Sequence, residues 1–139
     1  MNQFLLDTNA IIALLNNNES MLAKKVRQHS PNQICISSIV SHELFYGAFK
    51  SSRAKQNITL VESLQFEVLE FDKEDSKVSG EIRAQLALNG NPIGPYDVLI
   101  AGQAKARNLV LVTNNTNEFS RVNGLLIENW LDDLTQSKK

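Results

Sequence analysis

Short apolar runs alternate with longer helix-type segments along this chain, and this alternation limits the fold more than any other feature of the sequence. The strand-type runs are Gln3–Leu6, Gln33–Ser37, Phe66–Phe71, Leu109–Thr113 and Leu125–Ile127. The segments expected to be helical are 11–15, 20–29, 39–50 (capped by Ser38), 54–64, 73–88 and 96–107. Apolar strands separated by helices are typical of a parallel sheet that helices cover on both faces. The sequence therefore predicts an α/β domain.

The length and composition fit one folded domain. The chain has 139 residues, of which 42% are hydrophobic, with 14 Lys and Arg against 15 Asp and Glu. This composition excludes a disordered chain, a collagen-like repeat and a coiled coil. The net charge of −1 argues against a polybasic nucleic-acid binder. Because no linker or repeat interrupts the pattern, we expect a single domain over residues 1–134 and a frayed C-terminal tail over residues 135–139.

Cysteine usage and hydropathy predict a cytoplasmic protein that does not enter a membrane. Cys35 is the only cysteine, so neither an internal disulfide nor a cysteine-based zinc site can form. Its apolar neighbours predict a buried thiol. Asp7 interrupts the apolar residues near the N-terminus, no basic residue occurs before Lys24, and no run of 18 apolar residues occurs anywhere.

Four polar positions are expected at one edge of the sheet, where α/β proteins bind ligands: Asp7, Glu43, Asp97 and Asn115. Asp7 and Asn115 follow predicted strands, whereas Glu43 and Asp97 lie in the first turns of predicted helices. Helical spacing also places Glu43 and Asp97 on the same stripes as apolar residues. These two carboxylates are therefore expected to face the core, which is costly unless a partner meets them.

Each of these residues also has a simpler interpretation. Asp7 alone is typical of a turn and a helix cap, Glu43 and Asp97 are typical of helix N-termini, and Asn115 alone carries little information. The four together at one edge favour a shared site. Converging carboxylates repel one another unless a divalent cation lies between them, and oxygen ligands without paired His or Cys suit Mg²⁺ or Mn²⁺. Such a site supports phosphodiester hydrolysis by an activated water.

Four segments, in chain order, resemble the PIN-domain ribonucleases, and among them the VapC-type toxins of bacterial type II toxin–antitoxin systems. The segments are Leu5–Asn9, Ser41–Ala48, Ile93–Ala101 and Leu111–Phe119. The first and third are fairly specific, and the ordered set spans nearly the whole chain. The resemblance implies a PIN-like three-layer α/β/α domain with a mostly parallel five-stranded sheet, assembled as a homodimer.

The resemblance also assigns roles to individual residues. Asp7, Glu43 and Asp97 match the acids that bind Mg²⁺ or Mn²⁺ in the family, and Thr8 matches the hydroxyl beside the first of them. All three acids and Asn115 are therefore expected to be catalytic.

Asn115 departs from the pattern of the family. Thr113 and Asn115 match a Thr-x-Asp stretch in which many members have a fourth acid. An asparagine can orient a metal-bound water or accept a hydrogen bond, but it adds no charge. The sequence therefore leaves open whether one metal binds or two, and whether Glu118 supplies the carboxylate from one turn further on.

The implied activity is a metal-dependent endoribonuclease that inhibits translation. Its implied partner is a VapB-type antitoxin, and contact with operator DNA is implied only through this antitoxin. The glycine–proline loop and the stretch after Thr113 are closest to the enteric subgroup, whose members cut the anticodon loop of initiator tRNA, so this tRNA is the expected RNA substrate. The alternative is a non-catalytic PIN-like module that binds RNA or protein, because Asn115 replaces an acid. A different α/β phosphoryl-transfer enzyme is disfavoured, since no phosphate-binding glycine loop occurs.

Further residues are candidates for contacts with RNA. RNA phosphates require cations, and any of four basic residues fits that role or is simply solvated: Lys50, Arg53, Lys55 and Arg121. Tyr46 and Phe49 fit either stacking on bases or packing at a dimer or antitoxin surface. His42 is interpreted as a local hydrogen-bonding residue, and Trp130 is expected to pack the C-terminal segment onto the domain.

Overall fold

The computed structural model describes residues 2–131, which form a five-stranded sheet flanked by helices. The strands are β1 (Phe4–Leu6), β2 (Ile34–Ser37), β3 (Glu67–Leu69), β4 (Val110–Val112) and β5 (Ile127–Glu128). Their order is β3-β2-β1-β4-β5, and all four strand pairs are parallel. In the centre, Leu5 of β1 pairs with Cys35 on one side and Leu111 on the other. The predicted α/β fold with a five-stranded sheet is confirmed.

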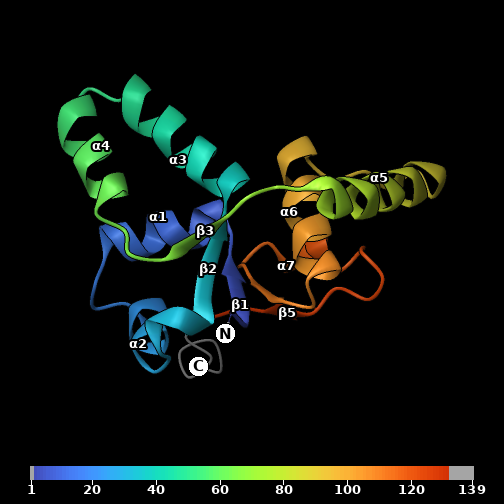
Figure 1. The fold of residues 1–139 in the computed structure, drawn as a ribbon, viewed down its shortest axis with the longest axis horizontal. Coiled ribbons are helices and arrows are strands. Elements are labelled where there is room, and N and C mark those ends of the chain that lie inside the picture. Colours follow the sequence, from blue (N-terminus) through green and yellow to red (C-terminus); the bar gives the residue numbers. More distant parts are fainter. Residues whose placement is uncertain (1, 132–139) are drawn as a thin grey trace.

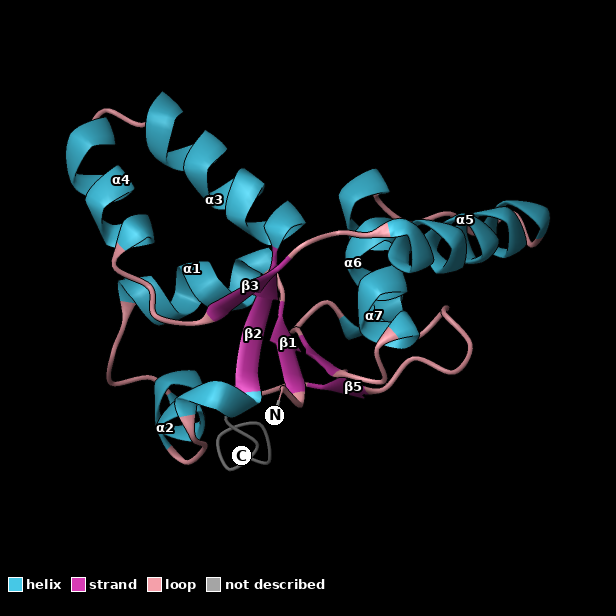
Figure 2. Cartoon of the chain, in the orientation of Figure 1, coloured by secondary structure: helices cyan, strands magenta, loops and turns pink. Residues whose placement is uncertain are grey.

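Helices occupy the connections between these strands. They are α1 (Thr8–Asn16), α2 (Met21–Arg27), α3 (Ser38–Lys50), α4 (Ala54–Glu62), α5 (Lys73–Leu88), α6 (Pro95–Ala106) and α7 (Thr116–Phe119), with a short 3₁₀ turn at Pro31–Gln33. In Figure 1, α1 to α4 lie to one side of the central strands, and α5 to α7 lie to the other. Figure 2 shows the strands enclosed between these two groups, which gives the three-layer arrangement.

Side-chain caps decide where the helices begin. The Asp7 carboxylate accepts a hydrogen bond from the Ala10 N–H, so α1 begins at Thr8, three residues earlier than expected. The prediction that Ser38 caps the next helix was wrong. Ser37 has an extended backbone and its hydroxyl accepts from the Ile39 N–H, while Ser38 is the first helical residue.

Short elements differ most from the expectation. The four-residue helix α7 was not predicted, because four residues do not complete two turns and show no periodicity. Strand β3 covers 67–69 rather than 66–71, and β5 covers 127–128 rather than 125–127. Both are edge strands, so only one neighbour defines their ends.

The central strands form the core. All three residues of β1 and all four residues of β2 are buried. The expected burial of Cys35 is confirmed, and it raises the pKa of the thiol to about 12. Trp130 is 2% exposed and stacks on His29 beside Phe4, so the prediction for the C-terminal segment is confirmed.

Helices α5 and α6 pack closely against each other. A Cβ at Gly102 would lie 2.7 Å from the Cα of Ser79, so only glycine permits this approach. At the far end of α6, Arg107 donates to the buried carboxylate of Asp75 at 2.9 Å, and Gln103 donates to the same oxygen at 3.0 Å. These contacts hold α6 in place, and α6 carries Asp97 in its first turn.

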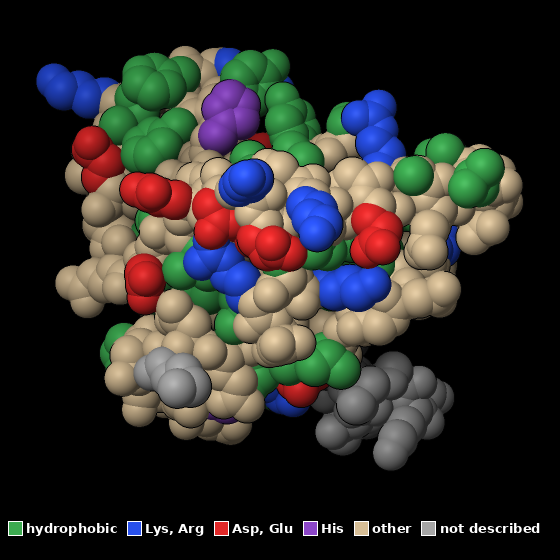
Figure 3. Space-filling view, turned by 45° about the vertical axis from the view of Figure 1, so that its right-hand side comes forward, with side chains coloured by type: hydrophobic (Ala, Val, Ile, Leu, Met, Phe, Trp, Pro, Cys, Tyr) green, Lys and Arg blue, Asp and Glu red, His purple; other side chains and the backbone are tan. Residues whose placement is uncertain are grey.

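The surface in Figure 3 carries acidic and basic side chains side by side across its middle, with apolar side chains above and below them. On this face, acidic and basic side chains are therefore interspersed and do not form separate patches. Among residues 2–131, no helix is long and apolar enough to cross a membrane. The expected domain end at residue 134 and the tail 135–139 lie outside the described residues.

Candidate active site

The candidate site lies where the direction of the strand order reverses. From β1 the chain goes on to β2 on one side, and from β4 it goes on to β5 on the other. Connections that leave two adjacent parallel strands in opposite directions open a crevice beyond the carboxyl ends of those strands. Asp7 follows β1 and the stretch 113–115 follows β4, so both border this crevice. The backbones meet there, since the Asp7 N–H donates to the Val112 carbonyl at 3.1 Å.

Asp7 is both a helix cap and a buried carboxylate. Its Oδ1 accepts from the Ala10 N–H at 2.9 Å, and its residue surface is only 4% exposed. Burial raises the pKa of Asp7, and the negative charge of Glu43 adds to this, although hydrogen bonds with Thr113 and Ala10 oppose it. The capping interpretation and the site interpretation therefore both hold for this residue.

Glu43 reaches the site from α3. The hydroxyl of Thr8, at the start of α1, donates to Glu43 Oε1 at 2.7 Å. Glu43 is half-buried, whereas Val40 and Leu44 on the same helix are buried. The predicted core-facing stripe of α3 thus holds for the apolar residues, and Glu43 lies at its edge.

Asp97 is held at the third position of α6. Gly94 is the N-cap and Pro95 is the first helical residue, one residue before the predicted start at Tyr96. A Cβ at Gly94 would contact Asp97 Oδ2 at 3.4 Å, so the loop backbone runs close beside this carboxylate. Asp97 is half-buried, and the stripe below it through Ile100 and Ala101 is fully buried, as predicted.

Asp97 lies within electrostatic range of three other carboxylates. Burial raises the pKa of Asp97 to about 6, and the charges of Glu118, Asp7 and Glu43 contribute in that order, together with a hydrogen bond to Glu118. Charges interact this way only at short range or through a poorly solvated medium. The structure therefore brings Asp7, Glu43 and Asp97 together, and it adds Glu118.

Asn115 connects to the acids through its neighbours. Its backbone N–H donates to the Thr113 hydroxyl at 2.9 Å, and its side-chain amide donates to Glu118 Oε2 at 2.8 Å. The amide therefore holds a carboxylate instead of supplying one. Glu118 lies three residues after Asn115, which is one turn of α7, and this spacing is the signal in the sequence that indicated it.

The donor set fits a hard divalent cation in composition. The side chains are carboxylates, an amide and hydroxyls, which are the ligands that Mg²⁺ and Mn²⁺ prefer. Among residues 2–131, however, no three acidic, His or Cys side chains are gathered closely enough to form a ready-made metal site. Glu43 and Glu118 instead hydrogen-bond to Thr8 and Asn115. Binding of a cation would therefore require these carboxylates to lie closer together than they do in this structure.

Comparison with known proteins decides the family. Residues 4–125 match the PIN domain. This chain belongs to the PIN-domain family. Two curated relatives, each named tRNA(fMet)-specific endonuclease VapC, are the protein of Shigella flexneri, at 41% identity over 132 residues, and that of Salmonella typhimurium, at 43% over 132 residues. Each alignment covers 94% of this chain and 99% of the relative.

Solved structures place the chain within the VapC group of PIN domains. The toxin chain of a DNA-bound VapBC from Salmonella typhimurium has a TM-score of 0.89 at 43% identity, with 94% of this chain and 99% of that chain covered. A VapBC2 from Rickettsia felis bound to a promoter DNA fragment has a TM-score of 0.86 at 36% identity, covering 91% and 98%. The suspected resemblance is confirmed over nearly the full length of this PIN domain.

The basic residues expected near the site have different surroundings in this PIN domain. Lys50 lies over the ring of Tyr46, with its ammonium 4.8 Å from the ring centroid. Arg121 donates to the Pro92 carbonyl at 3.1 Å and so ties α7 to the loop before Asp97. Lys55 and Arg53 are exposed around the start of α4.

Proposed function

We propose that this chain is a VapC-type endoribonuclease toxin that hydrolyses RNA with the help of Mg²⁺ or Mn²⁺. The observation that carries the proposal is the grouping of Asp7, Glu43 and Glu118 around Asp97, whose pKa is raised to about 6 by burial first and by the charges of these three acids next. Unneutralised carboxylates in one crevice destabilise the fold, so a function that needs their charge explains them best.

Asp7, Glu43 and Asp97 would hold the cation, which supplies polarisation of the phosphate and of a water when bound. Thr8 keeps the Glu43 carboxylate turned toward α1, and Asn115 keeps Glu118 turned toward Asp97. Hydrogen bonds within the chain thus orient the acids, and Asp7 and Thr113 are themselves buried.

The substrate we propose is initiator tRNA, cut in its anticodon loop. Two relatives at 41% and 43% identity carry the name tRNA(fMet)-specific endonuclease. The alignments extend over almost the full length of both proteins, so the segments that border the crevice are included. Cleavage of this RNA would stop translation initiation, and we propose that the protein acts in the cytoplasm, where this RNA is used.

Cleavage of purified initiator tRNA tests the proposal. We expect a cut in the presence of Mg²⁺ or Mn²⁺, none with excess EDTA, and none by Asp7→Asn or Asp97→Asn proteins that melt cooperatively. Glu81→Gln is the matched control, because Glu81 is an exposed acid on α5. Cleavage by Asp7→Asn at the wild-type rate would overturn the site. RNA binding by the wild type without cleavage of any RNA would favour the non-catalytic module instead.

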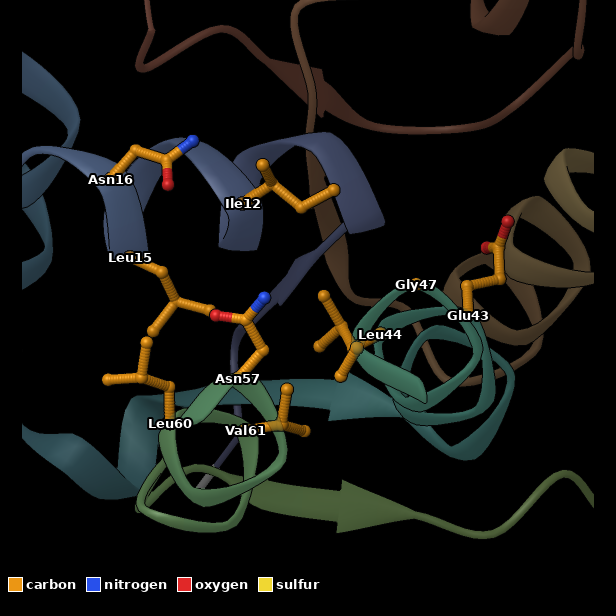
Figure 4. A pocket seen from close by; sticks show the side chains of 10 residues that line it. Ile12, Leu15, Asn16, Glu43, Leu44, Gly47, Asn57, Leu60 and Val61 are labelled. Carbon is orange, nitrogen blue, oxygen red and sulfur yellow. The ribbon is translucent and has the colours of Figure 1, made fainter. Parts of the chain in front are cut away.

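An apolar groove offers a place for the antitoxin. Figure 4 shows the groove between α1, α3 and α4, with Glu43 at one end and apolar side chains along it. Its volume is about 270 Å³, and the exposed side chains of Ile12 and Leu60 border it. The solved neighbours are VapBC complexes. We propose that an apolar segment of a VapB-type antitoxin occupies this groove and so blocks the site beside Glu43.

Co-purification with the antitoxin tests whether the antitoxin occupies this groove. Ile12→Asp and Leu60→Asp are expected to lower retention of the co-expressed VapB-type antitoxin, whereas Leu126→Asp, an exposed leucine away from the groove, is expected to leave it unchanged. Full retention in both groove variants would contradict the assignment. Operator DNA is expected to bind only when the antitoxin is present. We also propose a homodimer, which sedimentation of the free toxin tests.

A further inference from the structure

Four exposed rings form a row that begins beside the candidate site. On α3, His42, Tyr46 and Phe49 are spaced four and three residues apart, which puts them on one face of the helix. At the start of α6, Tyr96 lies against His42 with ring centroids 5.9 Å apart. Tyr46 is 60% exposed and Phe49 is 66% exposed. Figure 3 shows a histidine flanked by apolar side chains near the top of that face.

The row has an acidic end and a basic end. His42 directly precedes Glu43, and Tyr96 directly precedes Asp97, so the first two rings adjoin two of the candidate metal ligands. At the other end, the Lys50 ammonium lies over the Tyr46 ring. A strand that follows the rings therefore passes from a cation toward the carboxylates.

The row is separate from the groove proposed for the antitoxin. The groove uses Leu44, Gly47 and Ala48 of α3, which lie on the opposite side of the helix from His42 and Phe49. The groove is lined mainly by aliphatic side chains, whereas the row consists of rings with polar edges. The two surfaces of α3 thus differ in chemistry.

Unpaired RNA is the ligand that fits rings next to a cation. Proteins recognise single-stranded RNA by stacking bases on aromatic side chains and by pairing its phosphates with Lys or Arg. From His42 to Phe49 the helix rises about 10 Å, which matches about three steps of a stacked strand. We propose that Tyr96, His42, Tyr46 and Phe49 stack the unpaired bases that flank the cleaved bond. This deepens the proposed function, on which it rests, and it explains selection of a loop over a duplex.

RNA binding, measured with proteins that cannot cleave the RNA, tests whether these rings stack bases. All proteins carry Glu43→Gln to prevent cleavage, and the probe is a fluorescent unpaired 12-nucleotide RNA, free or annealed to its complement. Tyr46→Ala and Phe49→Ala are each expected to weaken binding of the unpaired RNA about tenfold. Tyr46→Phe, which keeps the ring, is expected to bind as the parent does. Leu88→Ala is the matched control, because Leu88 is exposed at the far end of α5.

Three results would overturn the proposal that these rings stack RNA bases. One is unchanged affinity for unpaired RNA in both alanine variants. Another is an equal loss for the duplex, which stacking does not predict. The last is a loss of self-association or of antitoxin binding with RNA affinity intact, which would make the rings a protein contact. The proposed function fails separately, through absence of cleavage by the chain with Glu43 restored. Melting curves of each variant confirm that it is folded.

Discussion

The Thr8 hydroxyl donates a 2.7 Å hydrogen bond to Glu43 Oε1 across 35 residues of sequence. Thr8 is the first residue of α1 and Glu43 lies within α3, so this bond joins the helices that follow two neighbouring strands. A neutral donor to a carboxylate fixes its direction without neutralising it. The bond therefore keeps the Glu43 carboxylate oriented at the site.

Removing that hydroxyl is expected to slow catalysis. Thr8→Val keeps the shape of the side chain but cannot donate, so Glu43 loses its orientation. We expect cleavage of initiator tRNA to fall about tenfold, since a hydrogen bond to a charged group contributes about 1.5 kcal/mol or more. Thr8→Ser keeps the donor and is expected to retain most of the rate. Equal rates for the valine and serine variants would contradict the role of the bond.

Asp97 makes the stability depend on pH. Burial, followed by the charges of Glu118, Asp7 and Glu43, raises the pKa of Asp97 to about 6 from its ordinary value of 3.8. Between these values the folded state holds the proton more tightly than the unfolded state, so the free energy of unfolding falls as the pH rises from about 4 to about 6. Asp97→Asn is expected to flatten this profile and to raise the melting temperature at pH 8 in EDTA. Thermal melts across this range measure the effect.

The control for that melt is Glu81→Gln, whose exposed carboxylate is not expected to alter the profile. Saturating Mn²⁺ is expected to raise the melting temperature of the wild type more than that of Asp97→Asn, because a cation stabilises only the state that binds it. If the wild type were equally stable at pH 4 and pH 8 in EDTA, the inference that carboxylates crowd around Asp97 would be wrong.

Asn115→Asp adds a fifth carboxylate to the crevice in place of a hydrogen-bond donor. The variant loses the 2.8 Å hydrogen bond to Glu118 and places two carboxylates in contact. Without metal we expect a lower melting temperature, and with metal we expect tighter Mn²⁺ binding by calorimetry. Asn114→Asp, at an exposed neighbour, is the matched control. Unchanged Mn²⁺ affinity would show that position 115 lies too far from the metal to matter.

Arg107 supports the buried carboxylate of Asp75 far from the site. Burial alone would raise the pKa of Asp75, but hydrogen bonds from Arg107, the Asp72 backbone and Gln103 outweigh it and lower the pKa. Arg107→Met leaves this charge unpaired, so we expect a loss of about 3 kcal/mol in the free energy of unfolding at pH 7.

The loss should shrink at low pH. A carboxylate with a lowered pKa stabilises the fold above its unfolded pKa, and this contribution disappears as the pH falls through its folded pKa. Urea unfolding at pH 7 and pH 3 compares the two conditions. Arg83→Met, at an exposed position of α5, is expected to change little at either pH. An equal loss at both pH values would mean that packing, and not charge, accounts for the effect.

The long helices and the central strands were predictable because their signals are local. Periodicity over 73–88 predicted α5 without error, and the predicted helix over 96–107 differs from α6 by one residue at each end. Local signals failed where an element was too short to repeat, as in α7, or where two adjacent serines competed for one cap. The Ser38 hydroxyl instead accepts a hydrogen bond from the N–H of Phe71, which is far away in the sequence, and Ser37 caps the helix.

By itself the sequence determined the order of strands and helices, the acids at their ends and the family they resemble, because periodicity and spacing act within about 15 residues. Tertiary structure alone decided that Thr8 meets Glu43 and that Glu118 lies beside Asp97. The contact between Thr8 and Glu43 depends on the pairing of β1 with β2, which brings together residues 35 positions apart in the sequence. Repulsion and burial then set the pKa of Asp97, and both follow from distances that no local pattern encodes.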